Sequence, residues 1–293
     1  MTLFFIVVIM LMRVVQSVYN KRTAIFLPDG IKSYIAYIAV FNLFAAAFSV
    51  VSLITDGGFG AVDLKTVIIA SCSGAFLALG SYCSIKSLTG GTVALNSVFD
   101  TAGLIVPCIL GIYFFNEPVG IVGFLCIIGV LASAAMLIDS SKSLTGVFTA
   151  KTLFYLIVSM LSNGMVMFCQ KLFGMYVVDG NVCMFSLLTF LIPSIVMGIM
   201  LLFMRADDKE QIKLPKKLIL YAVYLSFAVF IIQQFVTLLT PHLSSTVLFT
   251  VVNGGATVIA AIVGAVLYKE KITPKSALGI ILGISALIMI NAC

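Results

Sequence analysis

The side chain best placed to do chemistry in this sequence is a carboxylate inside an apolar segment. Asp100 lies within SVFDTAGLIVP, and Asn96, Ser97 and Thr101 fall on the same face of a helix, three or four residues apart. A charged carboxylate at the centre of a bilayer costs at least about 2.5–3.5 kcal/mol, so we expect it to face the protein interior or water. The patch offers an acid, an amide and two hydroxyls to a polar part of a small molecule.

A structural role for Asp100, as a partner that fixes the packing of another helix, is the alternative. Arg13 is the partner that depth suggests. With a rise of about 1.5 Å per residue, Asp100 lies roughly 12 Å from one end of its helix, and Arg13 roughly 16 Å from the opposite end of the first helix. These heights nearly coincide in a core of about 30 Å. We hypothesise that the two pair in at least one state and that substrate or a proton competes for one of them; otherwise Arg13 extends toward the membrane surface.

Two adjacent amides and a tyrosine extend the candidate site. Gln233 and Gln234 project about 100° apart on a helix, so only one of the two amides can face lipid at low cost. We expect one of them to line a cavity, and the other can be structural. Tyr82 adds a hydroxyl group within another apolar segment.

The composition places these residues in a membrane. Of 293 residues, 62% are hydrophobic and 10% are charged, too few for the surface of a soluble domain. A spanning helix needs about 20 apolar residues, and the runs do not alternate as barrel strands would. The expected fold class is an all-α polytopic membrane protein with ten transmembrane helices. They are predicted at Thr2–Asn20, Tyr34–Leu53, Thr66–Leu88, Thr92–Phe115, Gly120–Ile138, Thr152–Phe173, Val182–Met204, Leu218–Leu239, Thr246–Tyr268 and Pro274–Ile290.

Basic residues are distributed unevenly between the two sides of the predicted bundle. Loops that follow odd-numbered helices carry 14 Lys and Arg residues, whereas the other side carries only Lys65 and Lys171. Because positive residues stay in the cytoplasm, we expect both termini to be external. The net charge of +6 therefore indicates topology, and no nucleic-acid partner is predicted.

The second half of the sequence repeats the first. A shift of 153 residues places 92–117 on 245–270 without a gap, with five identities in 26 residues. Because each half has five helices, equivalent loops must lie on opposite sides, and the basic residues follow that rule. The sequence therefore predicts two inverted five-helix repeats, 1–139 and 151–293, joined by a cytoplasmic linker at 140–150.

The repeat adds two residues of the ninth helix to the candidate site. Asp100 corresponds to Asn253, and Ser97 to Thr250. Inverted repeats place substrate sites near the bilayer midplane, where the halves meet. The predicted substrate-binding residues are Asp100, Asn96, Ser97, Thr101, Asn253, Thr250, Gln233, Gln234, Arg13 and Tyr82.

The repeated segments LNSVFDTAGLIVPCILGIYFFNEPVGIVGFLCIIG and TVVNGGATVIAAIVGAVLYKEKITPKSALGIILG resemble the EamA-type module of the drug/metabolite transporter superfamily. Glu117 and Glu270 match the Glu that closes the fourth helix of each half in that family. The Gly-containing helix that follows is matched by Gly123, Gly129, Gly279 and Gly283. The resemblance implies ten helices in two inverted halves, and alternating access of a small metabolite.

Glu117 and Glu270 also have a structural explanation. Each lies shortly before a proline, where we expect it to cap the start of the next helix. The motif Gly279-x-x-x-Gly283 allows close helix contact, within the chain or between chains.

One acid, one Arg and several amides suit a small polar or zwitterionic metabolite such as an amino acid, because each charge finds a partner. We expect a secondary transporter of such a metabolite. An exporter of organic cations or drugs is the alternative if Arg13 points away, and a non-transporting receptor or scaffold subunit is an alternative of another class.

No enzyme is predicted, because the motifs H-E-x-x-H and G-x-S-x-G do not occur and His242 is the single histidine. The prediction includes no catalytic residue, no metal site and no cofactor. The expected partners are a small-molecule substrate and the lipid bilayer, with proton coupling at Asp100 as a hypothesis. We expect a monomer or weak homodimer in a bacterial plasma membrane.

Overall fold

Apolar helices build the whole described part of the chain, in a computed structural model. The structure describes residues 2–28, 30–55, 62–88, 99–117, 120–137, 150–177, 180–204, 212–256, 258–259, 262 and 273–291. The helices are α1 (Thr2–Phe26), α2 (Ile31–Thr55), α3 (Leu64–Leu88), α5 (Ile105–Phe115), α6 (Ile121–Leu137), α8 (Ala150–Tyr176), α9 (Val182–Phe203), α10 (Lys216–Leu239), α11 (Ser245–Phe249), the π-helical turn η1 (Thr250–Gly254) and α13 (Pro274–Asn291).

The lengths and surfaces of these helices are those of membrane spans. Six are long and apolar enough to cross a bilayer: Thr2–Asn20, Ile31–Thr55, Leu64–Ser84, Ala150–Tyr176, Val182–Phe203 and Lys216–Leu239. Four apolar helices are shorter within the described residues: Phe99–Phe115, Ile121–Ser133, Ser245–Gly254 and Ala277–Ala286. Large apolar side chains such as Leu202 lie on the outside, 84% exposed, where lipid rather than water suits them. The predicted fold class, an all-helical polytopic membrane protein, is confirmed.

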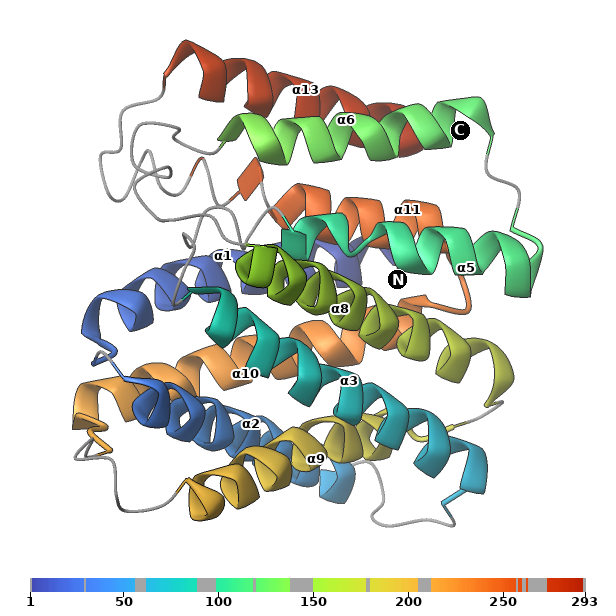
Figure 1. Cartoon of the computed structure of the whole chain (residues 1–293). Helices are drawn as coiled ribbons and strands as arrows, with labels where there is room; N and C mark the ends of the chain where they lie inside the picture. The colour runs from blue at the N-terminus through green and yellow to red at the C-terminus, as the bar shows by residue number, and fades with distance from the viewer. Residues whose placement is uncertain are drawn as a thin grey trace.

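The helices are arranged as an inverted repeat. Figure 1 shows that α1, α2 and α3 run in the opposite direction to their counterparts α8, α9 and α10. The packing has the same symmetry, because α3 packs against α8 as α10 packs against α1, and α3 packs against α9 as α10 packs against α2. The halves therefore interlock rather than forming separate bodies. The predicted linker lies outside the described residues, apart from Ala150.

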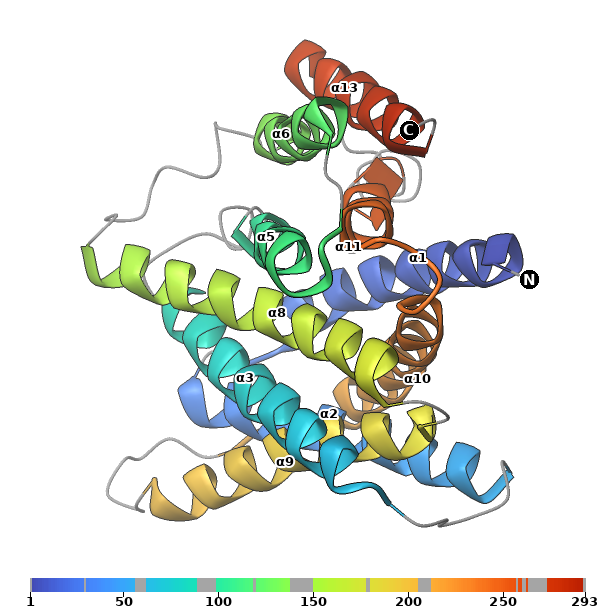
Figure 2. The same ribbon diagram turned by 90° about the vertical axis from the view of Figure 1, so that its right-hand side faces the viewer.

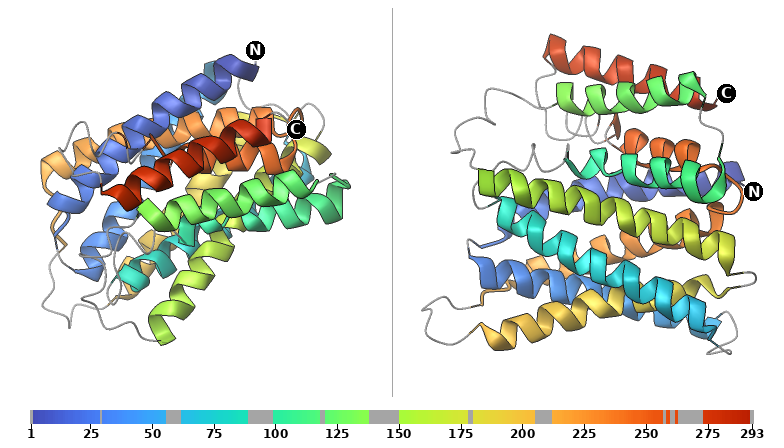
Figure 3. Two further views of the ribbon diagram at one scale, coloured as in Figure 1. Left: turned by 90° about the horizontal axis from the view of Figure 1, so that it is seen from above. Right: turned by 45° about the vertical axis from the view of Figure 1, so that its right-hand side comes forward.

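One helix from each half contributes to every layer of the bundle. Figures 1 and 2 show α6 beside α13 at one face, α5 beside α11 beneath them, and α2 with α9 at the far face. Both chain termini lie at the same end of the bundle (Figure 3, right), which we name the termini end. The largest buried apolar cluster includes Ile9, Leu104 and Phe249. It joins α1 to the fourth predicted helix, described over Phe99–Phe115, and to the ninth, described from Ser245 onward.

Small residues allow the closest helix crossings. A Cβ atom on Gly164 of α8 would overlap the Gly103 carbonyl oxygen of the fourth helix. A Cβ atom on Gly283 would lie 2.6 Å from the Ser133 hydroxyl, which donates a hydrogen bond of 2.6 Å to the Gly279 carbonyl oxygen. The Gly279-x-x-x-Gly283 motif thus packs α13 against α6 of the same chain.

Two buried or half-buried helix glycines give a matched test of this packing. Gly164→Ala should destabilise the protein by about 1–3 kcal/mol, because the added methyl group forces α8 away from the fourth helix. Gly198→Ala in α9 meets no atom within 4 Å. It should be neutral, or stabilise by up to about 1 kcal/mol, because glycine is a poor helix former. Thermal unfolding of the detergent-purified variants measures both; equal melting temperatures would contradict the crossing.

Candidate functional site

Asp100 faces other helices of the bundle. Its Oδ1 atom accepts a hydrogen bond from the Ser159 hydroxyl at 3.3 Å, and its carbonyl oxygen accepts one from Asn163 Nδ2 at 3.0 Å. Both donors lie on one face of α8, and Ser159 also lies 3.4 Å from the Gly80 carbonyl oxygen of α3. The carboxylate therefore lies where α3, α8 and the fourth helix meet. Sequence reasoning missed Ser159, because a serine in an apolar helix is common, although Asn163 four residues later marks a polar face.

The fourth helix is interrupted at Gly103 and Leu104, three residues after Asp100. The Gly103 N–H lies 3.1 Å from the Phe99 carbonyl oxygen and 3.3 Å from that of Asp100, and the chain turns before α5 begins at Ile105. Pro107 has no N–H to give to the Gly103 carbonyl oxygen, which instead accepts from Val106 at 3.1 Å. The break is thus a consequence of Pro107, and it leaves irregular backbone beside the carboxylate.

The ninth helix is irregular close to the equivalent place. Residues 250–254 form a π-helical turn, and the shift of 153 residues places them on 97–101, just before the break at Gly103–Leu104. Asn253 Nδ2 donates to the Phe249 carbonyl oxygen at 2.9 Å and lies 3.6 Å from the Met167 sulfur. The Thr250 hydroxyl is fully buried and finds no partner among the described residues. Turns of this kind are frequent at functional sites, so both halves carry a polar residue at a helix defect.

Both predicted amides of α10 are buried. Gln233 and Gln234 are 8% and 6% exposed, so neither faces lipid. Gln170 Nε2 donates to Gln233 Oε1 at 2.6 Å, whereas Gln233 Nε2 and Gln234 Nε2 have no partner in the described part of the chain. Gln170 is not among the site residues predicted from the sequence. These contacts leave two amide N–H groups available to an acceptor.

Arg13 does not reach Asp100 in this conformation. Its Nη1 donates to Gln16 Oε1 at 2.9 Å on the same helix, and its Nε atom is buried with no partner among the residues described. Pairing of Arg13 with Asp100 in another state stays a prediction.

The other predicted site residues are less informative. Tyr82 packs with Ile35 and Met197 in the apolar cluster between α2, α3 and α9, and Lys86 lies 5.8 Å from its ring centre. It is therefore not among the residues that contact Asp100 in the described structure, and its role stays a prediction. Thr101 lies in the turn that ends the interrupted helix. Asn96, Ser97 and Glu270 lie outside the described residues.

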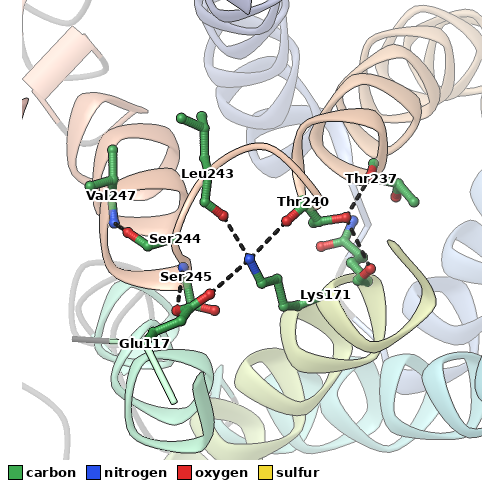
Figure 4. A network of polar contacts seen from close by, with 9 residues as sticks. Glu117, Lys171, Thr237, Thr240, Leu243, Ser244, Ser245 and Val247 are labelled. Atoms are coloured by element: carbon green, nitrogen blue, oxygen red, sulfur yellow. Dashed lines mark hydrogen bonds and ion pairs between the residues drawn. The ribbon is translucent and has the colours of Figure 1, made fainter. Parts of the chain in front are cut away.

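A buried ion pair lies at the termini end (Figure 4). Lys171 Nζ of α8 lies 2.8 Å from Glu117 Oε1, with side chains only 3% and 10% exposed. Lys171 Nζ also donates to the carbonyl oxygens of Thr240 at 2.8 Å and Leu243 at 2.6 Å. An ammonium group has three N–H donors, so all of them are used. Sequence analysis named Lys171 only as a basic residue of one side.

Glu117 corrects one prediction, because it does not cap the helix that follows it. Its Oε2 atom accepts a hydrogen bond of 2.7 Å from the backbone N–H of Ser245, at the start of α11. Asn116 ends α5 in the left-handed conformation, with φ of 49°, and so redirects the chain. The carboxylate of one half thus satisfies a free N–H at a helix start of the other half, where negative charge is favourable.

Comparisons with known proteins agree with this geometry. Residues 150–292 match the EamA-like transporter family. One solved crystal structure is similar over 99% of this chain and 96% of its own, with a TM-score of 0.78 and 9% sequence identity. At this identity the likeness shows the fold alone, over both halves. No curated protein sequence matches the chain.

The matched family consists of transporters, in agreement with the prediction that the chain is not an enzyme. The described helices of this chain are those of an integral membrane protein. The match over residues 150–292, about half of the chain, confirms the resemblance to this family predicted from the repeated segments.

Proposed function

We propose that the chain is a secondary transporter that moves a small polar or zwitterionic, amino-acid-like metabolite by alternating access. The observation that carries the proposal is the pair of helix defects close to equivalent places in the two halves, one at Gly103–Leu104 shortly after Asp100 and one at Thr250–Gly254. Irregular backbone is tolerated at membrane depth only inside protein or beside a cavity, and discontinuous helices form the substrate sites of many transporters.

The polar groups of the candidate site favour a substrate with both charges. Asp100 offers a carboxylate to an ammonium group. Arg13 Nε, Gln233 Nε2 and Gln234 Nε2 are buried donors without partners among the described residues. Leaving such a donor unpaired costs about 1–3 kcal/mol, so an acceptor such as a substrate carboxylate would stabilise the site. An amino-acid-like molecule supplies both groups at once.

The alternatives differ in what they leave unexplained. An organic cation would use Asp100 but would leave the unpartnered N–H donors unsatisfied. A non-transporting receptor would not need two equivalent helix defects. The proposed topology, with the termini end outside the cell, follows from the basic residues of the opposite loops.

Proton coupling at Asp100 is part of the proposal, because a proton and an ammonium group would compete for the same carboxylate. Proteoliposomes loaded with a pH-sensitive dye measure it. Substrate addition should change the internal pH, and a constant pH during uptake would exclude this coupling.

Asp100→Asn should weaken the binding of the stabilising ligand by about 5-fold to 15-fold, the loss expected when a charge-assisted hydrogen bond worth about 1.5–3 kcal/mol becomes a neutral one worth about 0.5–1.5 kcal/mol. The measurement is thermal stabilisation of purified protein across amino acids, amines and other polar metabolites. Asn keeps an oxygen that can accept the Ser159 hydrogen bond, so the fold should be retained.

Asp63→Asn is the matched control, because Asp63 is an exposed carboxylate at the start of α3 whose Oδ1 accepts from the Lys65 N–H. It should leave the ligand response unchanged. A panel in which only amines stabilise the protein would favour the cation exporter. An Asp100→Asn variant that melts lower but responds normally would make Asp100 a packing residue.

Thr250→Val separates binding from stability in a second way. The hydroxyl is buried without a partner among the described residues, so its removal should leave the melting temperature unchanged or raise it. If the hydroxyl binds substrate, affinity should fall about 10-fold, as for a lost hydrogen bond of about 1 kcal/mol or slightly more. Ligand titrations by thermal shift decide; normal affinity with lowered stability would remove Thr250 from the site.

A further inference from the structure

We propose that the Lys171–Glu117 ion pair is a latch that holds the termini end of the bundle closed and breaks whenever that end opens. The inference rests on the proposed function only in assuming two alternating states. It assigns a role to a charged pair that is not part of the proposed substrate site.

The latch joins the two halves of the molecule. Glu117 comes from the end of α5 in the first half, whereas Lys171 on α8 and the connection from Thr240 to Ser245 belong to the second (Figure 4). That connection is also held to α8 by packing, because a Cβ atom on Gly174 would overlap the Thr240 hydroxyl. Glu117 is therefore the charged group through which the first half holds this assembly.

The contacts break together rather than one at a time. If α5 moves away, Lys171 retains two carbonyl oxygens and no counter-charge, and the Ser245 N–H loses its acceptor. A buried charge without a partner is strongly unfavourable. Separation therefore requires water to reach the pair, and water reaches it when this end of the bundle opens. The latch has a closed, dry state and an open, hydrated state.

Stability alone does not account for such a pair. Replacing a buried ion pair by apolar side chains of similar size is often neutral or stabilising, because desolvation offsets the attraction between the charges. A charged pair that is buried in one state and hydrated in the other is a different case. Its side chains tolerate burial because they are paired with each other, and they tolerate the open state because water solvates them.

Glu117 and Ser245 lie on the two helices that carry the proposed substrate site, and Lys171 lies on α8, which contacts both of these helices. Glu117 follows Asp100 along the fourth helix by 17 residues, about 25 Å as helix, and Thr250 follows Ser245 on the ninth by five residues, about 7 Å. A ligand that draws Asp100 and Thr250 together would therefore change the angle between the helices whose ends the latch joins.

The double variant Glu117→Gln/Lys171→Gln tests the latch. It removes both charges, so no unpaired charge is left behind, while its amides can still bond the carbonyl groups and the Ser245 N–H. The full-length protein in lipid nanodiscs is followed by hydrogen–deuterium exchange. Residues 240–249 at the termini end should exchange several-fold faster than in the wild type, and residues 212–220 at the opposite end several-fold slower, because opening one end closes the other.

Two controls separate a latch from a structural contact. Lys65→Gln removes an exposed charge from the same end and should change neither region. Lys171→Arg keeps the charge and the donors, and should exchange like the wild type at both ends. Faster exchange at both ends, or at the termini end alone, would show loosening without a change of state and overturn the proposal. If the double variant is not recovered folded, Glu117→Gln alone is measured against the same criteria.

The outcome is independent of the proposed substrate. Reciprocal exchange with no stabilising ligand in the panel would support the latch and contradict the amino-acid-like substrate. A ligand that stabilises the protein through Asp100, without reciprocal exchange in the latch variants, would support the transporter and contradict the latch.

Discussion

The need to satisfy every backbone N–H and C=O group inside a bilayer governs this structure. Regular helices meet it at once, which explains why the described segments are helical and why their outer faces are apolar. An irregular segment meets it only where neighbouring helices supply partners. The break after Asp100 and the π-helical turn at Thr250 lie against α8, where Asn163 and Met167 contact them. The defects therefore lie inside the bundle, close to its polar side chains.

The inverted repeat places such a defect in each half, but the two differ in chemistry. Asp100 carries a charge and Asn253 does not, although they are equivalent in sequence. In the proposed function a symmetric fold surrounds an asymmetric site. The acid lies on the side of α3 and α8, and buried N–H donors of Arg13 and Gln234, without partners among the described residues, lie on α1 and α10. Such an arrangement suits a substrate that itself has two different ends.

Sequence reasoning predicted what depends on local composition and failed where distant segments meet. The ten helices and the inverted halves could be predicted because apolar length and basic loops are properties of contiguous residues. The interior position of Asp100 followed from the cost of its charge. The partner of Glu117 could not, because Ser245 is 128 residues away. The π-helical turn also left no signal, because a helix of one extra residue per turn has the same apolar composition as a regular one.

The ends of the fourth and ninth helices explain why the ion pair and the polar site belong to one mechanism. Each of these helices is interrupted within the bundle, so its outer part can tilt about the defect without unfolding. The outer part of the fourth helix ends at Glu117, and that of the ninth begins at Ser245. Glu117 joins these two parts through the Ser245 N–H and joins them to the continuous helix α8 through Lys171. Glu117 therefore lies at the end of a part that the defect frees to move, and its ion pair with Lys171 controls the separation of that part from α8.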